Sequence, residues 1–214
     1  MIHIPVLKNE VLKMLAPQPG EFMIDGTLGG GGHASLLHEA VGETGRLLVI
    51  DEDRTAIEHF IARTSCRMPH IMTVQENFSN CATLLAREGL GKADGLLLDL
   101  GLSSDQLAVS GRGFTFQKNE PLLMTLSDRH IALRDRLKEI DVLELEQIIH
   151  DYSGERFAHR IAKEIMIAVG QMKMETTFDL RNAIIRAVPR TYESGRIDPA
   201  TRTFLALRIY ANSE

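Results

Sequence analysis

The 214-residue sequence predicts an α/β fold with a parallel sheet, followed by a mostly helical segment. In the first half, short apolar runs of strand length alternate with stretches of helical period. Strands separated by helix-length segments are typical of βαβ units and a parallel sheet. The alternation ends near Gly101, where a loop rich in Gly, Ser and Phe leads into helical patterns only.

The predicted strands are four apolar runs bounded by turn residues, at 22–24, 47–50, 71–74 and 96–98. Helical patterns separate them, at 33–41, 54–63 and 79–88, and a leading helix is predicted at 8–15. In the helix predicted at 54–63, Ile57, Phe60 and Ile61 fall at i, i+3 and i+4 and share one helical face.

The second half predicts helices over 142–152 and 155–169. Thr177 is expected to cap a further helix that Pro189 ends, and Asp198 with Pro199 to begin a last one over 200–212. We therefore expect three parts. Residues 1–106 form the α/β domain, 107–190 a helical substrate-facing domain, and 191–214 a returning helix that packs on the α/β domain.

The composition favours a cytoplasmic protein. The chain is 44% apolar and 25% charged, with a net charge of −5. No apolar run approaches the roughly 20 residues that span a bilayer, and the N-terminus has no export signal. Cys66 and Cys81 have no metal-type spacing, and the scattered histidines form no ligand pattern. We expect no metal site and no membrane contact.

Charge is unevenly distributed along the chain. Residues 1–106 hold 8 Lys or Arg against 14 Asp or Glu, whereas residues 107–214 hold 16 against 15. Near the C-terminus arginine prevails, at Arg181, Arg186, Arg190, Arg196, Arg202 and Arg208. Two interpretations stay open: solvated helix faces, or a surface that contacts phosphates.

The stretch "MIDGTLGGGGHAS", residues 23–35, joins a predicted strand to a predicted helix through four consecutive glycines. Such a run brings backbone N–H groups close to a ligand. A P-loop is excluded, because Gly32 and His33 replace its Lys and Ser/Thr. A dinucleotide fingerprint is matched by Gly29, Gly31 and Ala34, with an acid about 20 residues later.

An acid before the glycines argues against a pyrophosphate. Asp25 ends the first strand, where its carboxylate would repel a phosphate but suit a ligand with a positive amino-acid end. S-adenosylmethionine has an ammonium, a sulfonium and a ribose, and no phosphate. Asp51, ending the second strand, can then accept hydrogen bonds from both ribose hydroxyls. A nicotinamide dinucleotide and a chance Gly-rich turn remain the alternatives.

Asp99 follows the fourth strand within "LLLDLGLSSDQL", residues 96–107. Ligands of open α/β sheets bind at the carboxyl ends of the strands. A carboxylate there can accept the N–H hydrogens of an exocyclic amine, and so favour the pyramidal, nucleophilic form of the nitrogen. Asp99 is therefore the predicted catalytic residue; the alternative is a buried acid that caps the next turn.

Seven motifs together resemble a known family. The strings "HIPVLKNEVL", "DGTLGGGGH", "ENFSN", "LLLDLGLSSDQL", "RGFTF", "GERFAHRIA" and "PATRTFLALRI" occur in the order seen in the bacterial 16S ribosomal RNA cytosine-N4 methyltransferases. The resemblance covers nearly the whole chain. It implies a Rossmann-like class I methyltransferase sheet with a helical inserted domain, which methylates cytosine N4 in the small ribosomal subunit or its precursor.

The resemblance also implies roles for individual residues. Gly31, Gly32 and His33 would hold the amino-acid end of S-adenosylmethionine, Asp51 the ribose, and Phe78 would pack near the adenine. Asp99 and Gln106 would complete the pocket beside the transferable methyl group.

The chain departs from the family pattern in two places. The family motif G-P-L-D-M-R-M reads Glu120 to Leu126 here, with Leu123 in place of the acid and Thr125 in place of the arginine. The sheet is expected to lack its C-terminal strands, which predicts a homodimer or another partner over the incomplete sheet. A methyltransferase acting on a small molecule or peptide, and a non-catalytic cofactor- or RNA-binding relative, remain alternatives.

Overall fold

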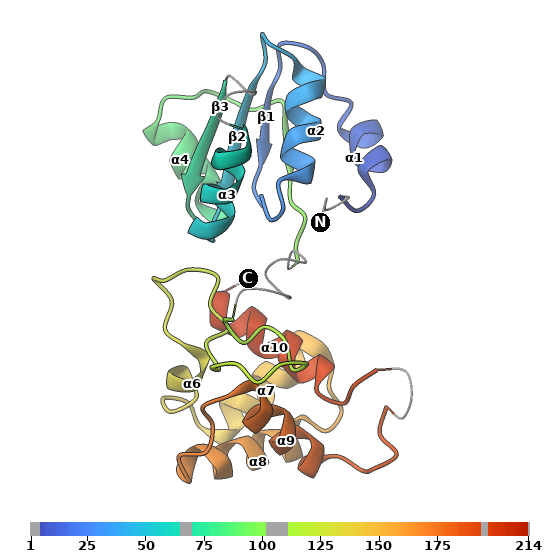
Figure 1. Cartoon of the computed structure of the whole chain (residues 1–214), viewed down its shortest axis with the longest axis vertical. Coiled ribbons are helices and arrows are strands. Elements are labelled where there is room, and N and C mark those ends of the chain that lie inside the picture. The colour runs from blue at the N-terminus through green and yellow to red at the C-terminus, as the bar shows by residue number, and fades with distance from the viewer. Residues whose placement is uncertain (1–4, 65–69, 102–110, 194–196, 214) are drawn as a thin grey trace. The chain divides into compact units, whose positions relative to one another are not determined.

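A computed structural model describes residues 5–64, 70–101, 111–193 and 197–213. The chain divides into two compact units, Met1–Asp105 and Gln106–Glu214. The first unit contains helix α1 (Lys8–Leu15) and then alternates β1 (Phe22–Asp25), α2 (Gly32–Val41), β2 (Arg46–Asp51), α3 (Arg54–Thr64) and β3 (Ile71–Gln75). The short helix η1 (Phe78–Asn80), α4 (Cys81–Arg87) and β4 (Gly95–Leu97) complete it (Figure 1).

Within the described residues, the strands form one four-stranded sheet in the order β3-β2-β1-β4, and every pairing is parallel. Met23 of β1 pairs with Leu47 of β2 and with Gly95 of β4. The predicted α/β fold with a parallel sheet is confirmed, and each of these strands lies within one residue of its predicted range.

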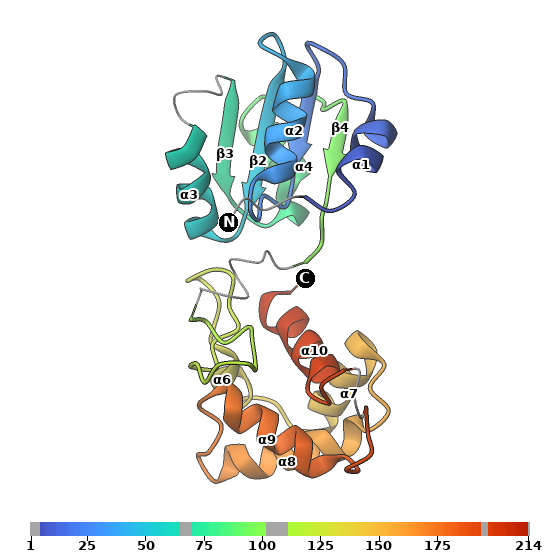
Figure 2. The same cartoon turned by 45° about the vertical axis from the view of Figure 1, so that its right-hand side comes forward.

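Helices cover both faces of this sheet, as Figures 1 and 2 show. On one face, Met23 and Leu47 pack with Leu37 of α2 and Phe60 of α3. On the other face, a second apolar cluster joins the sheet to Leu84 of α4. Because strands β1 and β2 contribute to both clusters, their inner residues are buried whichever way they point, as in other doubly covered parallel sheets.

Strand β4 is the edge of this sheet beside β1. In β4 and just after it, Leu96, Leu98 and Leu100 are 45%, 40% and 67% exposed. No strand among the described residues pairs with its outer edge. The first unit therefore has an apolar edge that its own described residues leave open to solvent.

The second unit is helical. It contains α6 (Leu133–Arg136), α7 (Val142–Ser153), α8 (Ala158–Gly170), α9 (Thr177–Ala187) and α10 (Thr201–Asn212). Helix α7 packs against α8 and α10, and α8 packs against α9. Since α10 also contacts α6, the last helix closes the core of its own unit; the expected packing of 191–214 on the α/β domain stays a prediction.

The segment from Leu122 to Leu126 is held to α10 through its backbone. The Asn212 side chain accepts a 2.7 Å hydrogen bond from the Leu126 N–H and donates one of 2.9 Å to the Met124 carbonyl. Asn212 is 1% exposed. Leu123 and Thr125, which differ from the acid and arginine of the motif noted above, lie in this segment. Main-chain bonds to Asn212 order the segment, so it does not depend on an acid or an arginine at these two positions.

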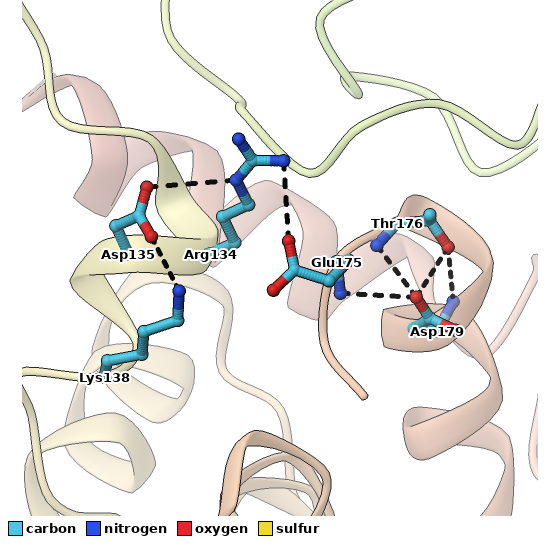
Figure 3. A network of polar contacts seen from close by, with 6 residues as sticks. All are labelled: Arg134, Asp135, Lys138, Glu175, Thr176 and Asp179. Atoms are coloured by element: carbon cyan, nitrogen blue, oxygen red, sulfur yellow. Dashed lines mark hydrogen bonds and ion pairs between the residues drawn. The ribbon is translucent and has the colours of Figure 1, made fainter. Parts of the chain in front are cut away.

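A polar network ties the start of α9 to α6 (Figure 3). Thr176 and Asp179 form a capping box, in which each side chain accepts a hydrogen bond from the other's backbone N–H. The predicted cap, Thr177, is wrong by one residue: its buried hydroxyl donates to the Lys118 carbonyl at 2.6 Å. Beside the box, Glu175 lies 3.5 Å from Arg134 of α6.

None of the helices in the described part of the chain is both long and apolar enough to span a bilayer.

Candidate active site

Three acids meet at the carboxyl edge of the sheet in the first unit. Asp25 is the last residue of β1, Asp51 the last of β2, and Asp99 lies two residues after β4. Because β1 pairs in parallel with both β2 and β4, these strand ends share one edge, where open α/β folds bind their ligands.

Asp25 is fully buried, and its Oδ2 atom has no hydrogen-bond partner among the described residues. Its Oδ1 atom accepts a 3.1 Å hydrogen bond from the Thr27 N–H. Burial raises the pKa of Asp25 to about 7, and the nearby Asp51 and Asp99 carboxylates add to this rise. A buried, unpaired carboxylate oxygen is costly, and a cationic ligand group would compensate it.

The glycine loop is shaped by its own contacts. Gly31 has a φ of +75°, and a Cβ added there would lie 2.5 Å from the Phe60 ring. The Gly31 N–H donates to the Leu28 carbonyl at 2.7 Å, and the Gly30 carbonyl accepts a 2.8 Å bond from Arg63. The Gly31 N–H is therefore already used, so the backbone groups left for a ligand belong to the following residues.

Helix α2 begins directly after this loop. The N–H groups of Gly32 and His33, in its first turn, have no partner within the described residues. The His33 side chain is 7% exposed, and its Nδ1 atom is buried without a described partner. Its Nε2 atom lies 3.6 Å from Asp99 Oδ2, so the structure brings two predicted site residues together.

Asp51 organises the second strand end. Its Oδ2 atom accepts a 2.9 Å hydrogen bond from the Gly29 N–H, and its Oδ1 atom one of 2.8 Å from the Asp53 N–H. Burial raises the pKa of Asp51 to about 6, against the lowering effect of these two N–H groups. Each carboxylate oxygen has a second lone pair, so the acid can still accept ribose hydroxyls.

Two residues that contact the predicted site or its neighbours were not predicted from the sequence. The Thr27 hydroxyl accepts a 2.6 Å hydrogen bond from the Asp99 N–H and so joins the ends of β1 and β4. Asn77 caps η1 by accepting the Ser79 N–H at 2.8 Å, and its amide donates to Glu52 Oε1 at 3.0 Å. Small polar residues after strands were the available signal, but nothing in the sequence identifies their partners.

Phe78 lies against the start of the glycine loop. A Cβ added at Gly26 would be 3.2 Å from the Phe78 Cβ and 2.6 Å from Leu98. The structure therefore places Phe78 beside β1 and β4, close to the predicted site. Gln106, the remaining predicted site residue, lies outside the described residues.

The arginines near the C-terminus are engaged within their own unit. Arg181 donates to Asp198 at 2.7 Å and Arg186 to Glu164 at 3.3 Å. Arg202 pairs with Glu193. Their charges are largely balanced, which weakens the phosphate interpretation for these three. Arg196 lies outside the described residues, and no cluster of three possible metal-binding side chains occurs within them.

A protein family and several known proteins match nearly the whole chain. A model described as the MraW methylase family matches residues 1–214. The ribosomal RNA small subunit methyltransferase H of Trichlorobacter lovleyi is 43% identical over 218 residues, covering 99% of this chain and 68% of that protein. The proteins of the same name from Anaeromyxobacter sp. (strain K) and Deinococcus radiodurans are both 41% identical over 212 residues, which is 99% of this chain and 67% and 65% of theirs.

The chain thus spans about two thirds of the length of these relatives. The family model and the relatives both match nearly the whole chain, so the match spans both units. The resemblance seen in the sequence motifs is confirmed: the chain belongs to the MraW methylase family, whose members are class I methyltransferases.

Proposed function

We propose that the protein methylates the N4 amine of cytosine in small-subunit ribosomal RNA, with S-adenosylmethionine as the methyl donor. The observation that carries this proposal is the group of Asp25, His33 and Asp99, in which two buried polar atoms lack partners among the described residues and lie beside an exposed carboxylate. The names of the relatives supply the substrate class.

The unpaired groups fit the amino-acid end of S-adenosylmethionine. Asp25 Oδ2 would accept the ammonium, and the free N–H groups of Gly32 and His33 at the start of α2 would donate to the carboxylate. Gly31 sets the turn that presents them. Asp51 would hold the ribose. Asp25 does not suit a pyrophosphate, because its carboxylate would repel it.

Phe78 and Gln106 would complete the site. Phe78, beside Gly26, would pack on the adenine, and Gln106 would lie near the transferable methyl group. When bound, S-adenosylmethionine supplies a methyl group made reactive by a positively charged sulfur.

Asp99 would act on the other partner of the reaction. Its carboxylate accepts an N–H hydrogen bond from the target amine, which withdraws the nitrogen lone pair from the ring and orients it in line with the methyl group. The amine would lose one proton as the N–C bond forms and the bond between methyl carbon and sulfur breaks, with S-adenosylhomocysteine as the leaving group, and the Asp99 carboxylate would take that proton. His33 Nε2, at 3.6 Å, would hold the carboxylate in position.

The target base would have to be unpaired or extruded to reach Asp99. Extrusion costs a few kcal/mol, less in a loop or junction than in a duplex. An assembled small subunit or its precursor is therefore a better substrate than a short duplex. Such a substrate would place the protein in the cytoplasm.

We also propose that another chain covers the β4 edge, as a homodimer or a bound partner. The exposed side chains of Leu96, Leu98 and Leu100 support this, because an open apolar sheet edge promotes association.

Transfer of tritium-labelled methyl groups tests the function. Wild-type protein is incubated with small subunits, with free small-subunit RNA and with a low-molecular-weight extract. We expect label in the RNA fractions. Label only in the extract would instead indicate a small-molecule methyltransferase. Binding of S-adenosylhomocysteine without label in any fraction would indicate a non-catalytic relative. Heat of binding with NAD alone would exclude the cofactor assignment.

A further inference from the structure

Two arginines of the second unit stack on an aromatic pair. The rings of Phe157 and Tyr192 meet edge to face, with centroids 4.9 Å apart. The Arg156 guanidinium lies 5.0 Å from the first centroid and 4.9 Å from the second. Arg160 lies 5.9 Å from the Phe157 centroid. Both are within the range of cation–π interaction.

Hydrogen bonds to neighbouring residues hold the aromatic pair in place. The Tyr192 hydroxyl donates a 2.6 Å hydrogen bond to Glu155, a fully buried acid. The second oxygen of Glu155 accepts the Phe157 N–H at 2.8 Å. Arg202 donates to the Tyr192 hydroxyl at 2.9 Å. These bonds hold Tyr192 and the Phe157 backbone in place beneath the two arginines.

The stacked arginines are exposed and have no carboxylate partner. Among the described residues, neither Arg156 nor Arg160 forms an ion pair or a side-chain hydrogen bond. Lys163 is also exposed and unpaired within this part of the structure, and it follows Arg160 by three positions on α8, hence on the same helical face. By contrast, Arg186 on the neighbouring α9 is paired with Glu164.

We infer that Arg156, Arg160 and Lys163 form a contact surface for RNA phosphates. The inference rests on the proposed RNA substrate and adds the residues that would position it. A stacked guanidinium offers its face to the ring and its N–H edge to a bidentate phosphate contact. Their unbalanced positive charge fits a polyanion, whereas Arg181, Arg186 and Arg202 pair with carboxylates of their own unit.

The test compares RNA affinity and its salt dependence between charge variants of the full chain. Fluorescence anisotropy with a labelled small-subunit RNA fragment is measured over a series of salt concentrations. The variants are Arg156→Gln with Arg160→Gln, Lys163→Gln alone, and Arg186→Gln as the matched control with a paired arginine. Calorimetry with S-adenosylhomocysteine and thermal melting monitor the site and the fold.

The double variant should bind RNA about 10- to 30-fold more weakly, because it releases fewer counterions from the RNA. Each lost phosphate contact should also reduce the steepness of log K against log salt by about 0.7 to 0.9. The slope of the double variant should fall by about 1.5, and that of Lys163→Gln by about 0.8. The control and the affinity for S-adenosylhomocysteine should stay near wild type. Lys163, which makes no stacking contact, keeps the test valid if the double variant melts early.

Two results would overturn the inference. In the first, wild-type protein binds RNA, but the double variant and Lys163→Gln have the same RNA affinity and the same salt slope as the Arg186→Gln control. The other is a loss of affinity for whole small subunits, measured in parallel with the same variants, with unchanged affinity for free RNA, which would indicate a protein contact. A wild-type protein that binds no RNA at all would instead count against the proposed function.

Discussion

At the scale of single residues, Asp25 combines a structural cost with a proposed role. Burial raises its pKa to about 7 in the folded protein, from 3.8. Between these values the folded protein keeps a proton that the unfolded chain has lost, so stability falls as the pH rises from about 4 to 7. Above pH 7 the buried charge remains as a standing cost to the fold.

Asp25→Asn should therefore be more stable than wild type at pH 8 by roughly 1–3 kcal/mol. At pH 4 the two should differ little, since both carry a neutral group. Urea unfolding at the two pH values measures this difference. A smaller fall with pH should remain from Asp51, whose pKa is raised to about 6. Equal stability of variant and wild type at pH 8 would contradict the buried-charge interpretation. The variant should also lose affinity for S-adenosylhomocysteine.

Asp51→Ala should weaken binding of S-adenosylhomocysteine by about 1–3 kcal/mol, the cost of leaving the ribose hydroxyls without a charged acceptor. Calorimetry measures the change. Since Asp51 also accepts the Gly29 and Asp53 N–H groups, Asp51→Asn serves as a control that keeps one oxygen and the side-chain volume. Unchanged affinity in both variants would exclude Asp51 as the ribose acceptor.

At the scale of elements, Asn212 joins the end of α10 to the segment from Leu122 to Leu126. Asn212→Ala leaves the Leu126 N–H and the Met124 carbonyl unpaired. We expect a loss of roughly 1–3 kcal/mol in unfolding free energy, because the site is buried. Hydrogen exchange should show earlier opening at Leu126. Asn9→Ala, on exposed α1, is the matched control and should have little effect. Protection of Leu126 as in wild type would show that other contacts order this segment.

The sequence predicted these elements better than the contacts that join them. Strand and helix positions follow from apolar period, which is local, and each strand fell within one residue of its prediction. The cap of α9 was misplaced by one residue because two threonines are adjacent, and only tertiary contacts decide between them. Thr177 is buried against Lys118, which leaves Thr176 to cap.

For the candidate site too, the sequence predicted the positions of residues better than the contacts between them. Asp25, Asp51 and Asp99 could be found because acids that end parallel strands must share one edge of the sheet. The contact between His33 and Asp99 depends on a separation of 66 residues in sequence and a fixed loop conformation, which no local pattern encodes. Equally, the Gly31 N–H was expected to face a ligand, and only the structure shows that it bonds to Leu28.

At the scale of the whole molecule, the open edge of β4 predicts association. We expect light scattering to show a dimer, or affinity purification to recover a bound partner, with the exposed leucines beside β4 at the contact. Leu100→Lys should disrupt it, whereas Leu143→Lys, an equally exposed site in the second unit, should not. Reductant should have no effect, since no cysteine is required. A monomer over a wide concentration range, with no partner recovered, would refute the prediction.

The most direct measurement is the identity of the methylated nucleoside. Small-subunit RNA treated with wild-type protein and S-adenosylmethionine is digested to nucleosides and analysed by mass spectrometry, beside RNA treated with Asp99→Asn. We predict N4-methylcytidine with wild type and a loss of about 100-fold or more in its rate of formation with the variant, since a carboxylate that accepts the amine N–H is removed. Affinity of the variant for S-adenosylhomocysteine should be nearly unchanged. Formation of N4-methylcytidine at the wild-type rate by Asp99→Asn, or a methyl group on any other position of the RNA, would contradict the account.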